Sequence, residues 1–231
     1  MKKIYSGFFL WLLLSAVLGS WRPGVNRNFL RGDIVAYVQS DAAVDYLIPQ
    51  NLEELEAGCT DIVQGVFRGT GNRQANQHVM AESDFTVEDG AGNVMLGALE
   101  FPDRTVTVSS LQITKVLKGG LRAGQAIPLG EEYHREEKDG KGKIYYNLDY
   151  LPSAAGREYL FFLNEDNDAS STFYGLYSPY SGAWGRYRVR SAEELKTRSV
   201  DSMIKWELEF GRDSADDYKS IYKEVIAKYM S

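Results

Sequence analysis

The sequence predicts a mainly β protein: a small closed β-barrel with a short N-terminal helix before it and C-terminal helices after it. Short apolar or alternating segments are separated by turns rich in glycine, asparagine and aspartate, without interleaved helices. Hydrophobic residues make up 44% of the chain, and its 15 tyrosines suit strands and barrel rims. Because such strands must bury a face, we expect them to close on themselves.

The first segment, residues 1–20, is predicted to be a signal peptide or an N-terminal membrane anchor. The basic pair Lys2-Lys3 is followed by an apolar run over residues 8–14 and by small residues that permit cleavage after Gly19. The 18 uncharged residues after Lys3 are also close to the lower length of a spanning helix. Either interpretation places the remainder of the chain outside the cytoplasm.

Three further parts follow along the chain. Residues 21–32 contain proline, glycine, asparagine and arginine in a pattern typical of a linker. Residues 33–190 hold the strand-like segments of the predicted barrel, and residues 191–231 form a C-terminal helical segment.

The barrel region begins with strand, helix and strand. Residues 33–49 alternate loosely and predict one or two short strands. Asn51 can cap a short helix over Leu52–Ala57, which Gly58 ends. The segment Thr60–Phe67 is an apolar strand with a glycine at its centre.

The middle of the chain is expected to consist of separate strands and turns. Residues 69–72 are expected to form a turn, and residues 78–101 a hairpin closed by residues 89–93. Residues 106–117 alternate well and predict a long strand, and residues 125–129 predict a further short one.

The second half contains a polar hairpin and the most apolar strand. Residues 131–150 are predicted to form a polar hairpin with a loop at residues 139–143. Residues 158–163 are the most apolar strand, and residues 173–189 predict a last aromatic strand pair.

The tail is predicted to be helical. Ser191 and Glu194 have the spacing of a capping box. Residues 203–210 alternate with period two and leave helix and strand open. From Tyr218 to Tyr229, apolar residues fall on one helical stripe, which we expect to dock on the barrel.

Three segments carry a family resemblance. The order of Cys-Thr-Asp-Ile-Val at 59–63, the strand ending at 113–119 and Gly-Arg-Glu-Tyr-Leu-Phe-Phe-Leu at 156–163 resembles the netrin-like OB barrels of tissue inhibitors of metalloproteinases. It resembles uncharacterised exported bacterial proteins with the same pattern more closely. The resemblance covers roughly residues 52–190 and implies an OB-like barrel. Those inhibitors chelate zinc through an N-terminal cysteine, but no cysteine precedes Cys59 here, so protease inhibition is only an alternative.

Charge and cysteine content exclude several classes of function. The formal charge is −6 and there is no basic stripe, so nucleic acid is not an expected partner. The single Cys59 can form neither an internal disulfide nor a cysteine-based zinc site, and we expect it to be buried. No cofactor is predicted.

One segment is a candidate metal site. Glu132, His134 and Glu136 alternate, so on a strand they share one face and could hold a divalent cation. The competing interpretation is a solvated hairpin balanced by nearby lysines. The alternative function that follows from the metal site is a metal-dependent hydrolase.

Aromatic residues near the end of the barrel region form the candidate ligand surface: Tyr174, Tyr177, Tyr180, Trp184 and Arg186. Such rings can stack on sugars or anchor a protein partner. Alternatively, they fill the barrel and support the terminal helix. No nucleophile elbow accompanies them. We therefore expect an exported cell-envelope protein, not an enzyme, that binds a protein or a cell-wall glycan and meets the membrane only through its N-terminal segment.

Overall fold

The computed structural model describes residues 34–40, 47–88, 94–147, 149–171, 173–212 and 214–230. All of these belong to the second of two units, Asp33–Ser231. The predicted signal peptide or anchor at 1–20 and the linker at 21–32 lie outside the described residues.

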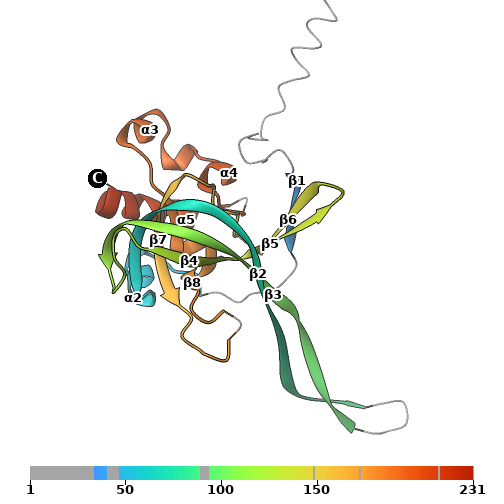
Figure 1. Cartoon of the computed structure of the whole chain (residues 1–231). Helices are drawn as coiled ribbons and strands as arrows, with labels where there is room; N and C mark the ends of the chain where they lie inside the picture. The colour runs from blue at the N-terminus through green and yellow to red at the C-terminus, as the bar shows by residue number, and fades with distance from the viewer. Residues whose placement is uncertain are drawn as a thin grey trace, which may run out of the picture. The chain divides into compact units, whose positions relative to one another are not determined.

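A closed five-stranded barrel forms the centre of this unit (Figure 1). Its strands are β2 (Asp61–Glu88), β3 (Val94–Lys118), β4 (Ala126–Glu131), β8 (Tyr177–Pro179) and β7 (Glu158–Glu165). Their order is β2-β3-β4-β8-β7, and β7 pairs back onto β2. β4 and β8 are parallel, the other neighbours are antiparallel, and β9 (Arg186–Arg188) adds to β7.

Closure depends on the first six residues of β2. Residues 61–66 pair with β7 along one edge, while residues 62–66 pair with the end of β3 along the other. These strands direct alternate residues into a common core. The core consists of Val63, Phe67, Leu111, Ile113, Ile127, Leu129, Tyr159, Phe161 and Leu163.

A second, three-stranded sheet is formed by β1 (Ile34–Ser40), β6 (Lys141–Asn147) and β5 (Tyr133–Lys138). β5 and β6 form the predicted polar hairpin, with a tip at Asp139 and Gly140. β1 pairs in parallel with β6.

Short helices complete the fold. They are α2 (Leu52–Gly58), η1 (Gly182–Gly185), α3 (Ala192–Thr197), η2 (Val200–Ser202), α4 (Lys205–Leu208), α5 (Asp216–Val225) and η3 (Ile226–Met230). Within the described ranges, no helix combines the length and apolar character needed to cross a bilayer.

The structure confirms the predicted fold class: a small OB-like barrel, a short N-terminal helix and C-terminal helices. The Asn51 side chain accepts from the Glu54 amide and caps α2 as expected. Ser191 and Glu194 form the predicted capping box at α3. In the ambiguous 203–210 segment, the structure places α4.

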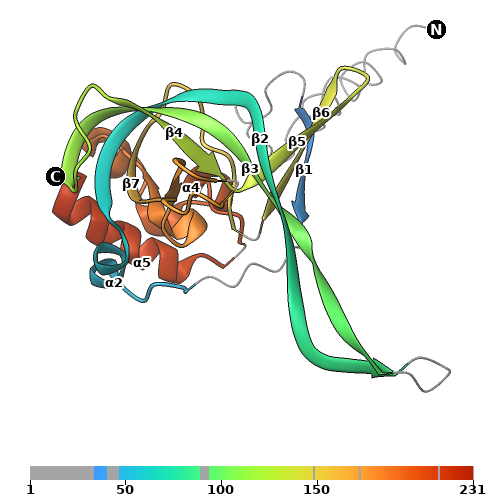
Figure 2. The same ribbon diagram turned by 60° about the horizontal axis from the view of Figure 1, so that its bottom comes forward.

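The expected turn at residues 69–72 is wrong, because these residues lie inside β2. Gly69 has a positive φ of 114°, and the register with β3 shifts there and again between Thr70 and Arg73. A register shift of this kind bends a strand without reversing it. β2 and β3 therefore form one long hairpin in place of two separate strands and a separate hairpin, and its outer part continues beyond the barrel (Figures 1 and 2).

Gly185 marks the tightest backbone approach in the η1 turn. A Cβ atom there would lie 2.4 Å from the carbonyl oxygen and 2.7 Å from the amide nitrogen of Tyr180, neither of which can rotate away. We expect Gly185→Ala to lower the free energy of unfolding by about 2 kcal/mol or more, measured by urea denaturation. Gly120→Ala is the control, since nothing lies within 4 Å of its added Cβ. Equal stabilities of the two variants would contradict the expected clash.

Candidate functional site

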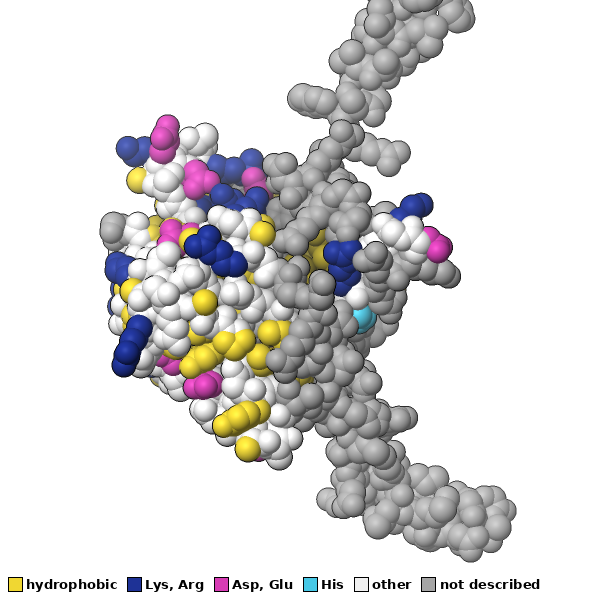
Figure 3. All heavy atoms as spheres, viewed as in Figure 1, with side chains coloured by type: hydrophobic (Ala, Val, Ile, Leu, Met, Phe, Trp, Pro, Cys, Tyr) yellow, Lys and Arg dark blue, Asp and Glu magenta, His cyan; other side chains and the backbone are white. Residues whose placement is uncertain are grey.

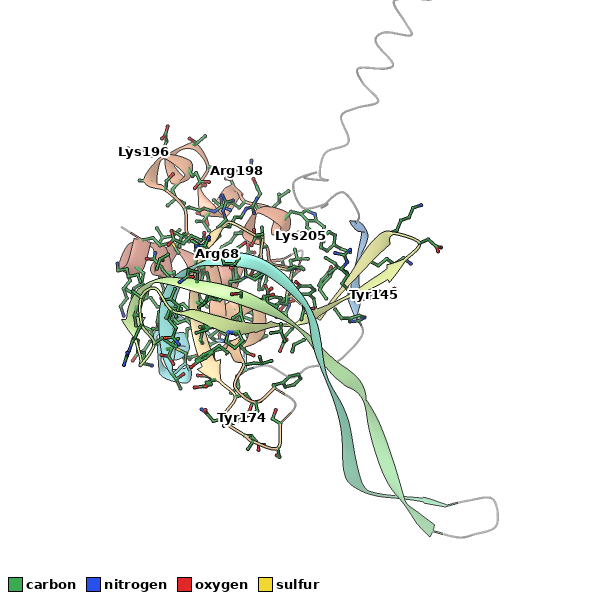
Figure 4. All side chains as sticks on the ribbon, in the orientation of Figure 1. Arg68, Tyr145, Tyr174, Lys196, Arg198 and Lys205 are labelled. Carbon is green, nitrogen blue, oxygen red and sulfur yellow. The ribbon has the colours of Figure 1, made fainter. Side chains whose placement is uncertain are left out.

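The structure does not place the five predicted ligand residues on one exposed surface. Trp184 and Arg186 are 4% and 2% exposed. Tyr177 is half-buried against the barrel core, and the half-buried Tyr180 ring lies against Gly58. Only Tyr174 is well exposed, at 59%, on the loop between β7 and β8 (Figure 4).

The C-terminal segment covers Trp184. The Trp184 ring meets Phe210 edge-on, with 5.1 Å between centroids, and Tyr218 with 6.0 Å. Tyr187 stacks on Tyr218 with 5.0 Å between centroids. These contacts agree with the alternative interpretation, in which the aromatic residues support the terminal helix.

Arg186 is part of a buried ionic cluster with Glu131. Its Nη1 atom lies 3.6 Å from Glu131 Oε1 and donates to Ser153 Oγ at 2.9 Å. The same Glu131 oxygen accepts from Tyr150 Oη at 3.1 Å and from the Ser153 amide at 2.9 Å. Ser109 Oγ donates to Glu131 Oε2 at 2.8 Å. Both oxygens of a fully buried carboxyl are thus hydrogen-bonded.

A second acid extends the cluster into the C-terminal segment. Arg186 Nη2 donates to the Glu209 carbonyl oxygen at 2.7 Å, and Arg157 Nη1 lies 2.5 Å from Glu209 Oε1. The Arg186 guanidinium lies 4.4 Å from the centre of the Tyr150 ring. Tyr218 Oη donates to the Arg186 carbonyl oxygen at 2.6 Å. The cluster therefore joins the barrel to the chain that follows it.

Burial raises the pKa of Glu131, although Arg186 and the hydrogen bonds from Ser153 and Ser109 oppose that rise. Burial also opposes the charge of Arg186, but its neighbours Tyr150 and Glu209 raise its pKa overall. These ionisable groups are held against one another.

The sequence did not predict the buried cluster of Glu131, Arg186 and Glu209. Glu131 stands beside Glu132 at the end of a short strand, a pattern typical of the start of a polar loop. Glu209 lies in the ambiguous segment, and no local pattern indicates that Arg186 would meet either acid. The residues around Arg186 also give no such signal, because its period-two neighbour in β9 is a second arginine, Arg188.

The structure describes the side chains of two of the three residues in the predicted metal site, Glu132 and His134. Glu132 is 3% exposed and precedes β5, while the His134 ring stacks on Tyr145 with centroids 4.8 Å apart. Glu136 pairs with Lys143 in the β5–β6 register, and its side chain lies outside those described. Among the described residues, no group of three acidic, histidine or cysteine side chains could hold a metal ion. A site that includes Glu136 stays a prediction.

Cys59 is buried, as expected. Burial raises the pKa of its thiol to about 11, so the reactive thiolate is disfavoured near neutral pH.

The outer part of the β2–β3 hairpin is the other candidate interaction element, and we call it the arm. It comprises residues 76–88 of β2 and 94–105 of β3, paired from Asn76–Thr105 to Glu88–Val94. β4 pairs with β3 only from Thr107 onward, and β7 pairs only with residues 61–66. Among the described strands, none other pairs with the arm.

Charges of both signs are interspersed over the face drawn in Figure 3, among the residues that the structure describes. No family model, curated protein or solved structure matches this chain. Inferences about its function therefore rest on its own geometry.

Glu132 should make stability depend on pH. Burial raises its pKa to about 8 from an ordinary value of 4.5. Because the folded chain holds this proton more tightly, the stabilisation is complete below about pH 4.5 and is lost as the pH rises to about 8. We expect native stability to fall by up to about 1.4 kcal/mol per pH unit across this window, and Glu132→Gln to flatten the curve.

Urea denaturation from pH 5 to pH 9 measures this effect. Glu193→Gln is the control, because it removes an exposed carboxyl from α3 and should leave the native curve unchanged. Parallel curves for the native chain and Glu132→Gln would contradict the expectation.

Glu131 and Arg186, the buried ion pair, should contribute to the free energy of unfolding in a strongly coupled way. Arg186→Met leaves the Glu131 carboxyl without its cation and should cost about 3–5 kcal/mol of unfolding free energy. Glu131→Gln combined with Arg186→Met removes that uncompensated charge, so the double variant should be the more stable of the two. Denaturant unfolding at neutral pH measures both.

Arg188→Met is the matched control. Arg188 lies on the same strand, is half-exposed and pairs with an exposed Glu194 at 3.0 Å. Its loss should cost less than about 1 kcal/mol. A double variant no more stable than Arg186→Met would show that the cluster acts through packing alone.

Proposed function

We propose that this protein is an exported, non-enzymatic interaction module of the cell envelope that presents its arm to a protein partner. One observation carries this proposal: β2 and β3 continue well past the strands that close the barrel, as a ribbon that pairs with no other described strand. The barrel itself is complete without the arm.

A ribbon of this kind favours an external partner. An isolated two-stranded hairpin is marginally stable in water, and stability normally needs a third strand or a packed face. Its outer edges also offer backbone donors and acceptors for strand addition. A partner that packs against the arm would stabilise its folded form, so the arm is well suited to recognition.

The buried cluster supports a non-enzymatic role. Catalytic acids and bases must come within hydrogen-bond reach of a substrate. Glu131, Arg186 and Glu209 are instead buried together and hydrogen-bonded within the chain. Their charges and hydrogen bonds therefore stabilise the fold.

A protein partner is favoured over a cell-wall glycan. Sugar stacking needs accessible rings, and of the five predicted ligand residues only Tyr174 is well exposed. Export is supported by the basic, apolar and small-residue pattern of residues 1–20. The netrin-like resemblance supports the fold, and protease inhibition gains no support without an N-terminal cysteine.

Site-specific photocrosslinking in the native host tests the proposal. A photoreactive residue at Met95 or Leu96, on neighbouring positions of the arm, should give covalent adducts with a protein. The same residue at the exposed Arg122, outside the arm, should give none. The absence of adducts from both arm positions would overturn the arm as the contact element.

Fractionation of the same cells tests export. The chain should occur in the medium beginning near Ser20, or in the membrane fraction with residues 1–20 retained. A full-length chain in the cytosol would overturn export. For the metal-dependent alternative, stoichiometric metal in the purified protein that is lost in His134→Ala would favour a hydrolase.

A further inference from the structure

The base of the arm is fixed to the rest of the chain on its β3 side. Thr107 Oγ1 donates to the Tyr133 carbonyl oxygen at 2.7 Å. Val106 is 2% exposed and packs in one cluster with Phe173 and Leu176. The pairing of β3 with β4 also begins at Thr107 and runs inward from there. β3 is therefore anchored as far out as Val106.

The pairing of β2 with β3 becomes irregular just beyond this anchored base. Gln77 pairs with Arg104 and Val79 pairs with Phe101, so two steps along β2 match three steps along β3. One extra residue is therefore inserted in β3 at residues 102–103, and we call this insertion the β3 bulge. The extra residue of a bulge is left unpaired and locally disrupts the ladder of backbone hydrogen bonds.

A proline weakens the pairing at the β3 bulge further. Pro102 has no amide hydrogen, so its backbone donates no hydrogen bond to a neighbouring strand. For that reason, proline within sheets is confined mainly to edge strands and bulges. β4 no longer pairs with β3 at this level, and β2 is the only described strand that pairs with residues 94–101. The two strands thus lose bonds to each other where no third described strand supports them.

We infer that the β3 bulge is a hinge about which the outer arm, residues 79–88 and 94–101, changes its orientation relative to the barrel. Hinges are a few residues at the ends of regular elements that absorb changes in backbone dihedral angles. Here the anchored base and the regularly paired stretch of residues 79–82 with 98–101 meet at the bulge. The outer arm then samples several orientations, from which a partner selects one. The motion itself does not depend on any partner.

Two neighbouring insertions lie on either side of the β3 bulge, and neither fits a hinge of the whole outer arm. At residues 70–73, three steps along β2 match one step along β3, but β3 is paired with β4 at this level. At residues 82–86, four steps along β2 match two along β3, well beyond the base. Motion there would bend only the end of the arm. The β3 bulge is the first irregularity beyond the point where the pairing with β4 ends.

Pulsed electron spin resonance between two spin labels on the purified full chain measures this motion. One label is attached at Met95→Cys, which lies about 20 Å along the strand from Phe101 at about 3.3 Å per residue. The other is attached at Arg122→Cys, an exposed position between β3 and β4. The native Cys59 is buried and its thiol has a raised pKa, so it should not take a label. The otherwise native chain should give a broad distribution of distances between the two labels.

Deletion of Pro102 equalises the steps along the two strands, so the ladder becomes continuous at the base of the arm. It should narrow the distance distribution at least about twofold, because the weak point is removed. Deletion of Ser83 and Asp84 is the matched control. It removes the insertion at residues 82–86, preserves the alternation of faces because two is even, and should leave the width unchanged. Deletion of Asp103 restores the same register and serves as the second hinge variant if circular dichroism shows that the first is unfolded.

The outcomes separate the hinge from the proposed function. A native distribution no wider than that of the hinge variants overturns the hinge. Equal narrowing by the control deletion distributes the motion along the whole ribbon and also overturns it. A mobile arm without photocrosslinks from Met95 and Leu96 leaves the hinge in place and overturns the proposed contact. A rigid arm that still forms crosslinks has the opposite meaning.

Discussion

The buried contact between Arg186 and Glu131 is the interaction on which the arrangement of this protein depends. It connects a barrel strand to β9, and through the Glu209 carbonyl oxygen it reaches the C-terminal segment. Burying two charges is costly unless hydrogen bonds occupy their remaining positions. Here Tyr150, Ser153 and Ser109 supply those bonds to the acid. Without this environment, burial of the Arg186 cation would be costly, and the chain after it would lose one of its polar links to the barrel.

The same contact lies beside the buried part of the predicted aromatic ligand surface. Once Arg186 is drawn inward, the residues beside it follow the strand into the interface with the terminal helix. Trp184 then packs against Phe210 and Tyr218, and Tyr187 stacks on Tyr218. Aromatic rings that resemble a binding platform in sequence thus become the packing between barrel and helix. Of the predicted set, Tyr174 keeps substantial exposure because its loop lies outside this interface.

The long β2–β3 hairpin, and not the aromatic loops, is the element proposed to meet a partner. Barrel closure uses only the first residues of β2 and the last part of β3. The outer part of both strands, residues 76–88 and 94–105, pairs with no other described strand. A ribbon that pairs with no other described strand presents the backbone donors and acceptors of its outer edges. Strand addition to such an edge, the contact proposed for the arm, relies on backbone hydrogen bonds and needs no cleft.

The sequence by itself determined the local features. Asn51 and the Ser191–Glu194 pair cap their helices through bonds within a few residues, and the polar hairpin turns at its Asp-Gly step. The closed barrel was also predictable from the sequence, because a series of short strands without interleaved helices must bury one face against itself. Only the tertiary structure decided that β2 runs through Gly69, because alternation indicates the faces of a strand but not how far its pairing continues. The burial of Arg186 likewise depends on an acid far away in the chain, and local patterns contain no information about that partner.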